Sequence, residues 1–111
     1  MFRAGFEQFI YESNVDGSGK AGSYIRALDM MGPILTQHYP EQIIHGTMWR
    51  EFSVEELDRI HRWLCEEAKK AREQDTELLN AFESKSYLKN GWCSAAVKAY
   101  QEFLVIKGLA K

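Results

Sequence analysis

The chain has 111 residues, of which 45% are hydrophobic and 27% charged, so it is long and apolar enough for one compact domain covering residues 1–111. That length excludes a Rossmann unit with a substrate domain and a TIM barrel, and the composition excludes extensive disorder. A net charge of −2 excludes a basic nucleic-acid footprint over the whole domain.

Helical periodicity begins at the N-terminus. Three phenylalanines and Ile10 recur at helical spacing and predict a helix over residues 2–13. The Gly-, Ser- and Asn-containing stretch 14–19 predicts a loop, and a second helix is expected from Ala21 or Gly22.

The second helix meets a proline. We expect Pro33 to kink or stop it, because proline lacks a backbone N–H, and we expect residues 34–39 to continue as a short helix. Residues 41–52 show no clear period and predict an irregular connector held in place by Trp49.

The clearest local signal is a capping box. Ser53 is followed three residues later by Glu56, a pattern that predicts a helix N-terminus. The helix is expected to end near Gln74, and its inward stripe comprises Leu57, Ile60, Leu64 and Ala68.

The C-terminal third predicts one further long helix. Residues 75–82 favour a helical turn or two and 84–91 a short connection, before a helix from about Ser94 to about Lys107 that stops at Gly108. These segments together predict an all-α fold, a compact bundle of five or six helices.

Cysteine and histidine usage argues against a disulfide framework or a metal centre. Cys65 and Cys93 are too few for a disulfide scaffold, and we expect both to be reduced and buried. His38, His45 and His61 are scattered, so no metal or other cofactor is predicted. Without a long apolar run, the chain predicts no signal peptide, no membrane partner and a cytoplasmic location.

Two patterns superficially resemble catalytic or nucleotide-binding motifs. Residues 17–20 (GSGK) imitate a phosphate loop, but Asn14 replaces its first glycine and Ala21 its magnesium ligand. A line formed by Asp58, His61 and Cys65 on one helix face would need to converge in a cleft to be catalytic. We therefore predict that the chain is not an enzyme.

The last quarter of the chain is basic. Residues 85–111 hold five lysines and one acid, Glu102, and aromatic residues lie among the lysines. The candidate DNA contacts are Lys85, Lys89 and Lys98, with Lys20 and Arg26; the candidate aromatic surface comprises Tyr87, Trp92 and Trp49. Phosphate contacts of this kind predict weak, sequence-independent binding to DNA.

A family resemblance covers most of the chain. It is carried by residues 18–29 (SGKAGSYIRALD), by Trp49 ahead of 53–57 (SVEEL), and by 86–104 (SYLKNGWCSAAVKAYQEFL). Together these segments resemble a helical module near the start of some bacterial HNH and other restriction-type endonucleases. The nuclease of such proteins lies downstream, and no His-Asn-His constellation follows here. The resemblance thus implies a non-catalytic module of a restriction or mobile-element nuclease system, positioned on DNA.

The alternative is a small protein-interaction module. Residues 51–77 are predominantly acidic, and the chain has three Trp, which are common anchors of protein interfaces. This pattern is typical of a dimerisation unit, forming a homodimer, or of an acidic inhibitor that binds another protein.

Overall fold

The computed structural model describes the chain at residues 2–13 and 20–111, with side chains described at 2–12 and 21–111. This part of the chain forms six helices and no strand: α1 (Phe2–Ser13), α2 (Lys20–His38), α3 (Val54–Glu73), α4 (Glu77–Ala81), α5 (Ser86–Lys89) and α6 (Trp92–Ile106). The predicted all-α bundle of five or six helices is confirmed.

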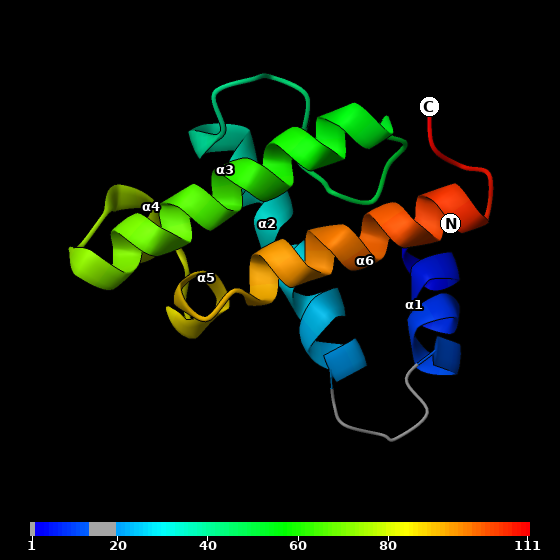
Figure 1. Cartoon of the computed structure of the whole chain (residues 1–111), viewed down its shortest axis with the longest axis horizontal. Helices are drawn as coiled ribbons and strands as arrows, with labels where there is room; N and C mark the ends of the chain where they lie inside the picture. The colour runs from blue at the N-terminus through cyan, green and yellow to red at the C-terminus, as the bar shows by residue number, and fades with distance from the viewer. Residues whose placement is uncertain (1, 14–19) are drawn as a thin grey trace.

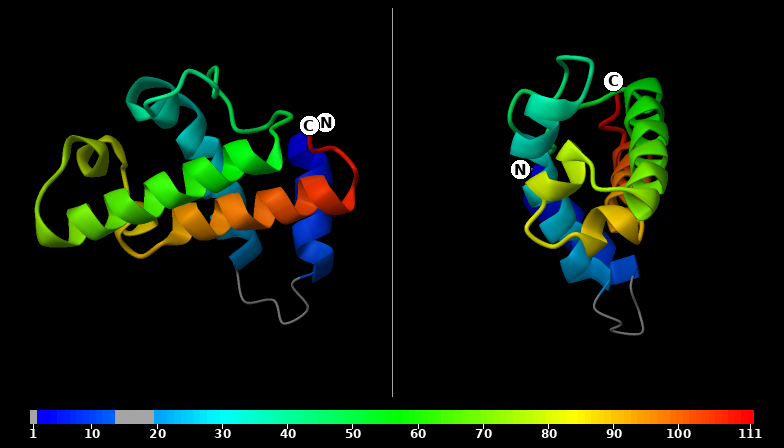
Figure 2. Two further views of the ribbon diagram at one scale, coloured as in Figure 1. Left: turned by 45° about the horizontal axis from the view of Figure 1, so that its top comes forward. Right: turned by 90° about the vertical axis from the view of Figure 1, so that its left-hand side faces the viewer.

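The helices form two layers (Figures 1 and 2). α3 and α6 run side by side in opposite directions, α2 crosses both from behind, and α1 lies behind the C-terminal end of α6. The thinnest extent of the molecule is 19 Å, about the thickness of two packed helices. The core lies between the layers, where Leu28 and Met31 of α2 and Val97 and Tyr100 of α6 are fully buried.

An aromatic cluster joins α1, α6 and the connector. The ring of Phe6 lies 5.7 Å, centroid to centroid, from each of the rings of Trp49, Tyr100 and Phe103. The Tyr100 hydroxyl donates a hydrogen bond of 2.7 Å to the carbonyl of Arg50. Burial raises the pKa of Tyr100, so the hydroxyl keeps its proton and remains a donor.

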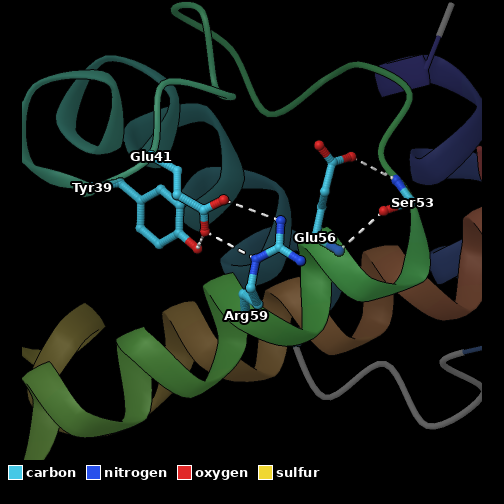
Figure 3. Close-up of polar contacts among 5 residues, drawn as sticks. All are labelled: Tyr39, Glu41, Ser53, Glu56 and Arg59. Atoms are coloured by element: carbon cyan, nitrogen blue, oxygen red, sulfur yellow. Dashed lines mark hydrogen bonds and ion pairs between the residues drawn. The ribbon is translucent and has the colours of Figure 1, made fainter.

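The connector between α2 and α3 is irregular, as predicted, and is tied to both helices (Figure 3). The capping box is present, since Ser53 Oγ accepts from the Glu56 amide at 3.1 Å and Glu56 Oε1 accepts from the Ser53 amide at 2.9 Å. Arg59 donates two hydrogen bonds to Glu41, at 2.9 and 3.1 Å, and Tyr39 donates to the same carboxylate. Burial, aided by Glu41, raises the pKa of Tyr39 to about 12.

The helix does not stop at Pro33, one of the two predicted outcomes, because α2 continues through Pro33 to His38. Proline removes one backbone hydrogen bond, while the apolar face stays buried on both sides of it: Leu28, Met31 and Leu35 are all inaccessible to solvent. Packing of this face outweighs one lost bond, so the helix expected at 34–39 is the last part of α2.

Three further details differ from prediction. The connection at 84–91 contains α5, and α6 begins at Trp92, two residues early, after Gly91 adopts a left-handed φ of 80°. Cys93 is buried as predicted, and burial raises the pKa of its thiol to about 12. Cys65 is exposed, because it lies one residue beyond Leu64 and so outside the inward stripe of α3.

Candidate interaction surface

α6 has two distinct faces. Its inward face, which includes Val97, Tyr100 and Leu104, fills the core. Its outward face repeats at helical spacing and comprises Ala95, Lys98, Ala99, Glu102, Val105 and Ile106. Those six residues combine small, charged and large apolar side chains, which is unusual for a face that only meets water.

An open groove of about 700 Å³ follows this outward face. Val54, the first residue of α3, borders it on one side; Ile10 of α1 and Tyr24 of α2 border it on the other. The floor is formed by α6 residues, among them Ala99 and Val105. The groove therefore exists only because α1, α2 and α3 converge around α6 (Figure 1).

The groove contains most of the exposed large apolar side chains in the described part of the chain. These side chains are Tyr11, Val54, Val105, Ile106 and Leu109. Three of them, Val54, Val105 and Ile106, line the groove, and the last two are 54% and 59% exposed. Exposed apolar side chains gathered in one groove mark a candidate interaction site, whereas singly exposed residues need no such explanation.

A polar clamp holds one wall of the groove in place. Gln101 Nε2 donates to the Val54 carbonyl at 3.1 Å and to Asp58 Oδ1 at 2.9 Å. Lys98 Nζ lies 3.3 Å from the same carboxylate oxygen. The hydrogen bond from Gln101 is the main reason that the pKa of Asp58 lies below its usual range, and the hydrogen bond from Lys98 adds to it. The Asp58 carboxylate in this clamp is therefore ionised at neutral pH.

The predicted DNA contacts are not gathered at one place. Lys98 is bound to Asp58 in the middle of α6, whereas the Lys89 carbonyl accepts a hydrogen bond of 2.9 Å from Arg72 Nε. Asp58 and Arg72 are on the same helix, and their positions in sequence put them about 21 Å apart along α3. Lys98 thus lies beside the first turns of α3, and the Lys89 backbone lies beside its last turn.

The other predicted contacts vary in their surroundings. Arg26 and Lys85 are exposed, and neither forms an ion pair within the described residues. The side chain of Lys20 and the phosphate-loop-like sequence at 14–19 lie outside the residues whose side chains are described.

The three candidate aromatic residues are half-buried and separate. Trp49 packs in the cluster around Phe6, and its Nε1 donates to Asp29 Oδ1 at 2.7 Å. The ring of Trp92 lies 5.9 Å from that of Tyr24, and Tyr87 is half-buried in α5. No ring contact joins these three residues to one another within the described part of the chain.

Asp58, His61 and Cys65 do not form a hydrogen-bonded line. His61 Nε2 is 3.7 Å from Cys65 Sγ, but the Asp58 carboxylate is turned toward Gln101 and Lys98. Burial lowers the pKa of His61, and the positive charge of Lys98 lowers it further. The absence of enzymatic activity stays a prediction.

Among the described residues, no group of three or more His, Cys, Asp or Glu side chains is placed to hold a metal ion. None of the described helices is both long and apolar enough to cross a membrane.

Sequence reasoning missed the groove residues Val54, Val105 and Ile106. A signal was present, since Val105 and Ile106 are apolar but fall outside the inward stripe of α6. Val54 could not be recognised from sequence, because its role depends on the clamp that places α3 beside α6.

No protein-family model, curated protein or solved structure matches this chain. The resemblance to modules of restriction-type endonucleases therefore stays a prediction.

Proposed function

We propose that the chain is a protein-interaction module whose binding surface is the groove along the outer face of α6. The observation that supports this most directly is the gathering of Val54, Val105 and Ile106 in one groove. Burying exposed apolar area of this kind against a partner is favourable by roughly 25 cal/mol for each Å² removed from water.

The shape and chemistry of the groove suit an α-helix. Its floor is itself a helix face, with the small side chains of Ala95 and Ala99 beside the large Val105 and Ile106. An amphipathic helix buries apolar residues at every third or fourth position and thus matches a groove of this form. Lys98 and Glu102 at the centre would select the charges of the incoming helix.

The clamp favours a preformed site. Gln101 and Lys98 fix Asp58 and the first turn of α3 to α6 before any partner arrives. A preformed surface loses less conformational entropy on binding than one that must be assembled.

Site-specific photocrosslinking in the cells in which the protein naturally occurs tests this proposal. Benzoylphenylalanine at the position of Ile106 is expected to give a discrete adduct, and at the exposed position of Glu73 none. Mass spectrometry should place the adduct on one face of a helix in one partner chain, and Val105→Glu should abolish it. Equal yields from the two positions would contradict the proposal.

A second candidate is the DNA-positioning module that the family resemblance implies. One observation favours it: Arg26 and Lys85 are exposed and form no ion pair within the described residues, which leaves both cations available to phosphate. Lys98 contributes less to this candidate, because Asp58 already offsets its charge.

A further inference from the structure

On the outer face of α6, charge and side-chain size are opposite at equal distances before and after Tyr100. Lys98 lies two residues before Tyr100 and Glu102 two residues after it. Small Ala95 lies five residues before and large Val105 five after. If this face met an antiparallel copy of itself, positive would face negative and small would face large.

We infer that the partner of this groove is a second copy of the chain, with the two α6 helices antiparallel. A twofold axis at the level of Tyr100 sets Lys98 of each copy beside Glu102 of the other, and Val105 of each beside Ala95 of the other. Every contact in such an interface is made twice, because the same patch serves both copies. This inference rests on the proposed function and names the molecule that would occupy its groove.

The two charged side chains are available for contacts between copies. A lysine ammonium has three donors, and Asp58 and Gln101 take two of those of Lys98, at 3.3 and 3.4 Å. The Lys98 side chain remains half exposed. Glu102 is exposed and forms no hydrogen bond or ion pair within the described residues. The pair between copies would therefore add to the existing contacts without breaking any.

The walls of the groove contribute to the same interface. Val54 of α3, Ile10 of α1 and Tyr24 of α2 line the groove beside α6 and come within reach of the second copy. α6 has only 15 residues, and a stable interface commonly buries about 800 Å² on each partner. We thus expect an association that depends on protein concentration and draws on these flanking residues.

The first test is sedimentation of the full chain from micromolar to millimolar concentration. Glu102→Lys sets two lysines side by side across the axis and is expected to raise the dimer Kd by about tenfold or more. Glu73→Lys makes the same charge change on the exposed end of α3, away from the groove, and should leave the Kd unchanged. A monomer at every concentration, or equal effects of the two variants, would overturn the inference.

Charge complementation sharpens the test. Lys98→Glu alone should also weaken self-association, but mixed with Glu102→Lys it should form heterodimers, because both pairs across the axis then carry opposite charges. Lys98→Glu places a carboxylate beside Asp58, so its thermal unfolding is measured first. A folded mixture that fails to associate would overturn the inference.

Cysteine trapping tests the direction of the helices without changing any charge. In a Cys65→Ser background, Ala95→Cys mixed with Val105→Cys should crosslink on oxidation, and Ala95→Cys alone should not. Self-crosslinking of Ala95→Cys would show a parallel pair and overturn the antiparallel arrangement. Photocrosslinks from Ile106 to a different protein, with the chain monomeric, would refute the second copy and leave the proposed function standing.

Discussion

Gly32 has less room for an added side chain than the other glycine of α2, Gly22. A Cβ built at this position would lie 2.6 Å from the Gly46 carbonyl oxygen and 2.8 Å from the Thr47 Cα. Both are backbone atoms of the connector, so they cannot turn aside as a flexible side chain would. Thr36 stabilises this contact between α2 and the connector. Its Oγ1 donates to the Gly32 carbonyl and accepts from the Gly46 amide, each at 2.7 Å.

Gly32→Ala is therefore expected to destabilise the fold by about 1–3 kcal/mol, the usual range for an overpacked site. Gly22→Ala is the matched control on the same helix, since its Cβ would meet only the Tyr11 hydroxyl, at 3.9 Å. Replacing an exposed helical glycine by alanine should be neutral or stabilising by up to about 1 kcal/mol. Chemical denaturation of the two variants gives the comparison, and a similar loss in both would contradict this account.

Asp29 joins α2 to α1 and to the connector. Its carboxylate accepts hydrogen bonds from Arg3 Nε at 3.0 Å, Arg3 Nη2 at 2.9 Å and Trp49 Nε1 at 2.7 Å. The Arg3 hydrogen bond is the main reason that the pKa of Asp29 lies below its usual value. Folding thus favours the ionised form of this side chain.

The lowered pKa fixes the direction of the pH dependence. The stabilisation from Asp29 is present above its unfolded pKa, near 4, and is lost as pH falls through the lower pKa of the folded state. Asp29→Asn should cost up to about 1 kcal/mol at pH 7, a modest value because both side chains of the ion pair are half exposed. Unfolding measured from pH 7 to pH 2 should show a smaller loss of stability in the variant than in the parent chain. A steeper loss in the variant would contradict the assignment.

The start of α3 shows how local chemistry fixes an element boundary. The Ser53 and Glu56 hydrogen bonds satisfy amides that would otherwise lack partners at the helix N-terminus. Ser53→Ala should cost about 1 kcal/mol of stability, as N-cap removals do. Ser84→Ala removes an exposed hydroxyl that bonds only to the Ser86 hydroxyl and should change the melting temperature little. Thermal unfolding by circular dichroism measures both, and an unaffected Ser53→Ala variant would contradict the capping role.

Elements set by local chemistry were the ones that sequence predicted well. The capping box, the inward stripe of α3 and the end of α6 near Lys107 follow from residues close together in the chain. The continuation of α2 through Pro33 depends on burial of Leu28 and Leu35 against other helices, which a local pattern does not contain. Tertiary packing determines that α2 continues, because burial of a whole apolar face stabilises the helix by more than the loss of one backbone hydrogen bond destabilises it.

At the scale of the whole molecule, the candidate sites depended on which faces the helices leave uncovered. The sequence placed Lys89 and Lys98 in one basic segment, but Lys98 contacts the first turns of α3 and the Lys89 carbonyl contacts its last turn. The three tryptophans are each half-buried against an aromatic partner within the chain. The groove was assembled from α1, α2, α3 and α6, and no single segment of the sequence contains it.

The distribution of cations over the molecule gives the DNA-positioning candidate a direct test. Fluorescence anisotropy of labelled duplex and single-stranded DNA at low and moderate salt measures binding and its salt dependence. If the exposed cations contact phosphates, Arg26→Glu and Lys85→Glu should each weaken binding, and each lost contact should reduce the slope against salt by about 1.

Lys98→Gln serves as an internal comparison for that test. Asp58 already offsets the Lys98 charge, so this variant should weaken DNA binding less than Lys85→Gln. Binding that is lost with Lys98→Gln and retained with Lys85→Gln would place the DNA contact on the α6 groove, and would then compete with the second copy for the same surface. Absence of binding at micromolar protein and low salt would remove the DNA candidate as an activity of this chain and leave the groove as its one proposed interaction surface.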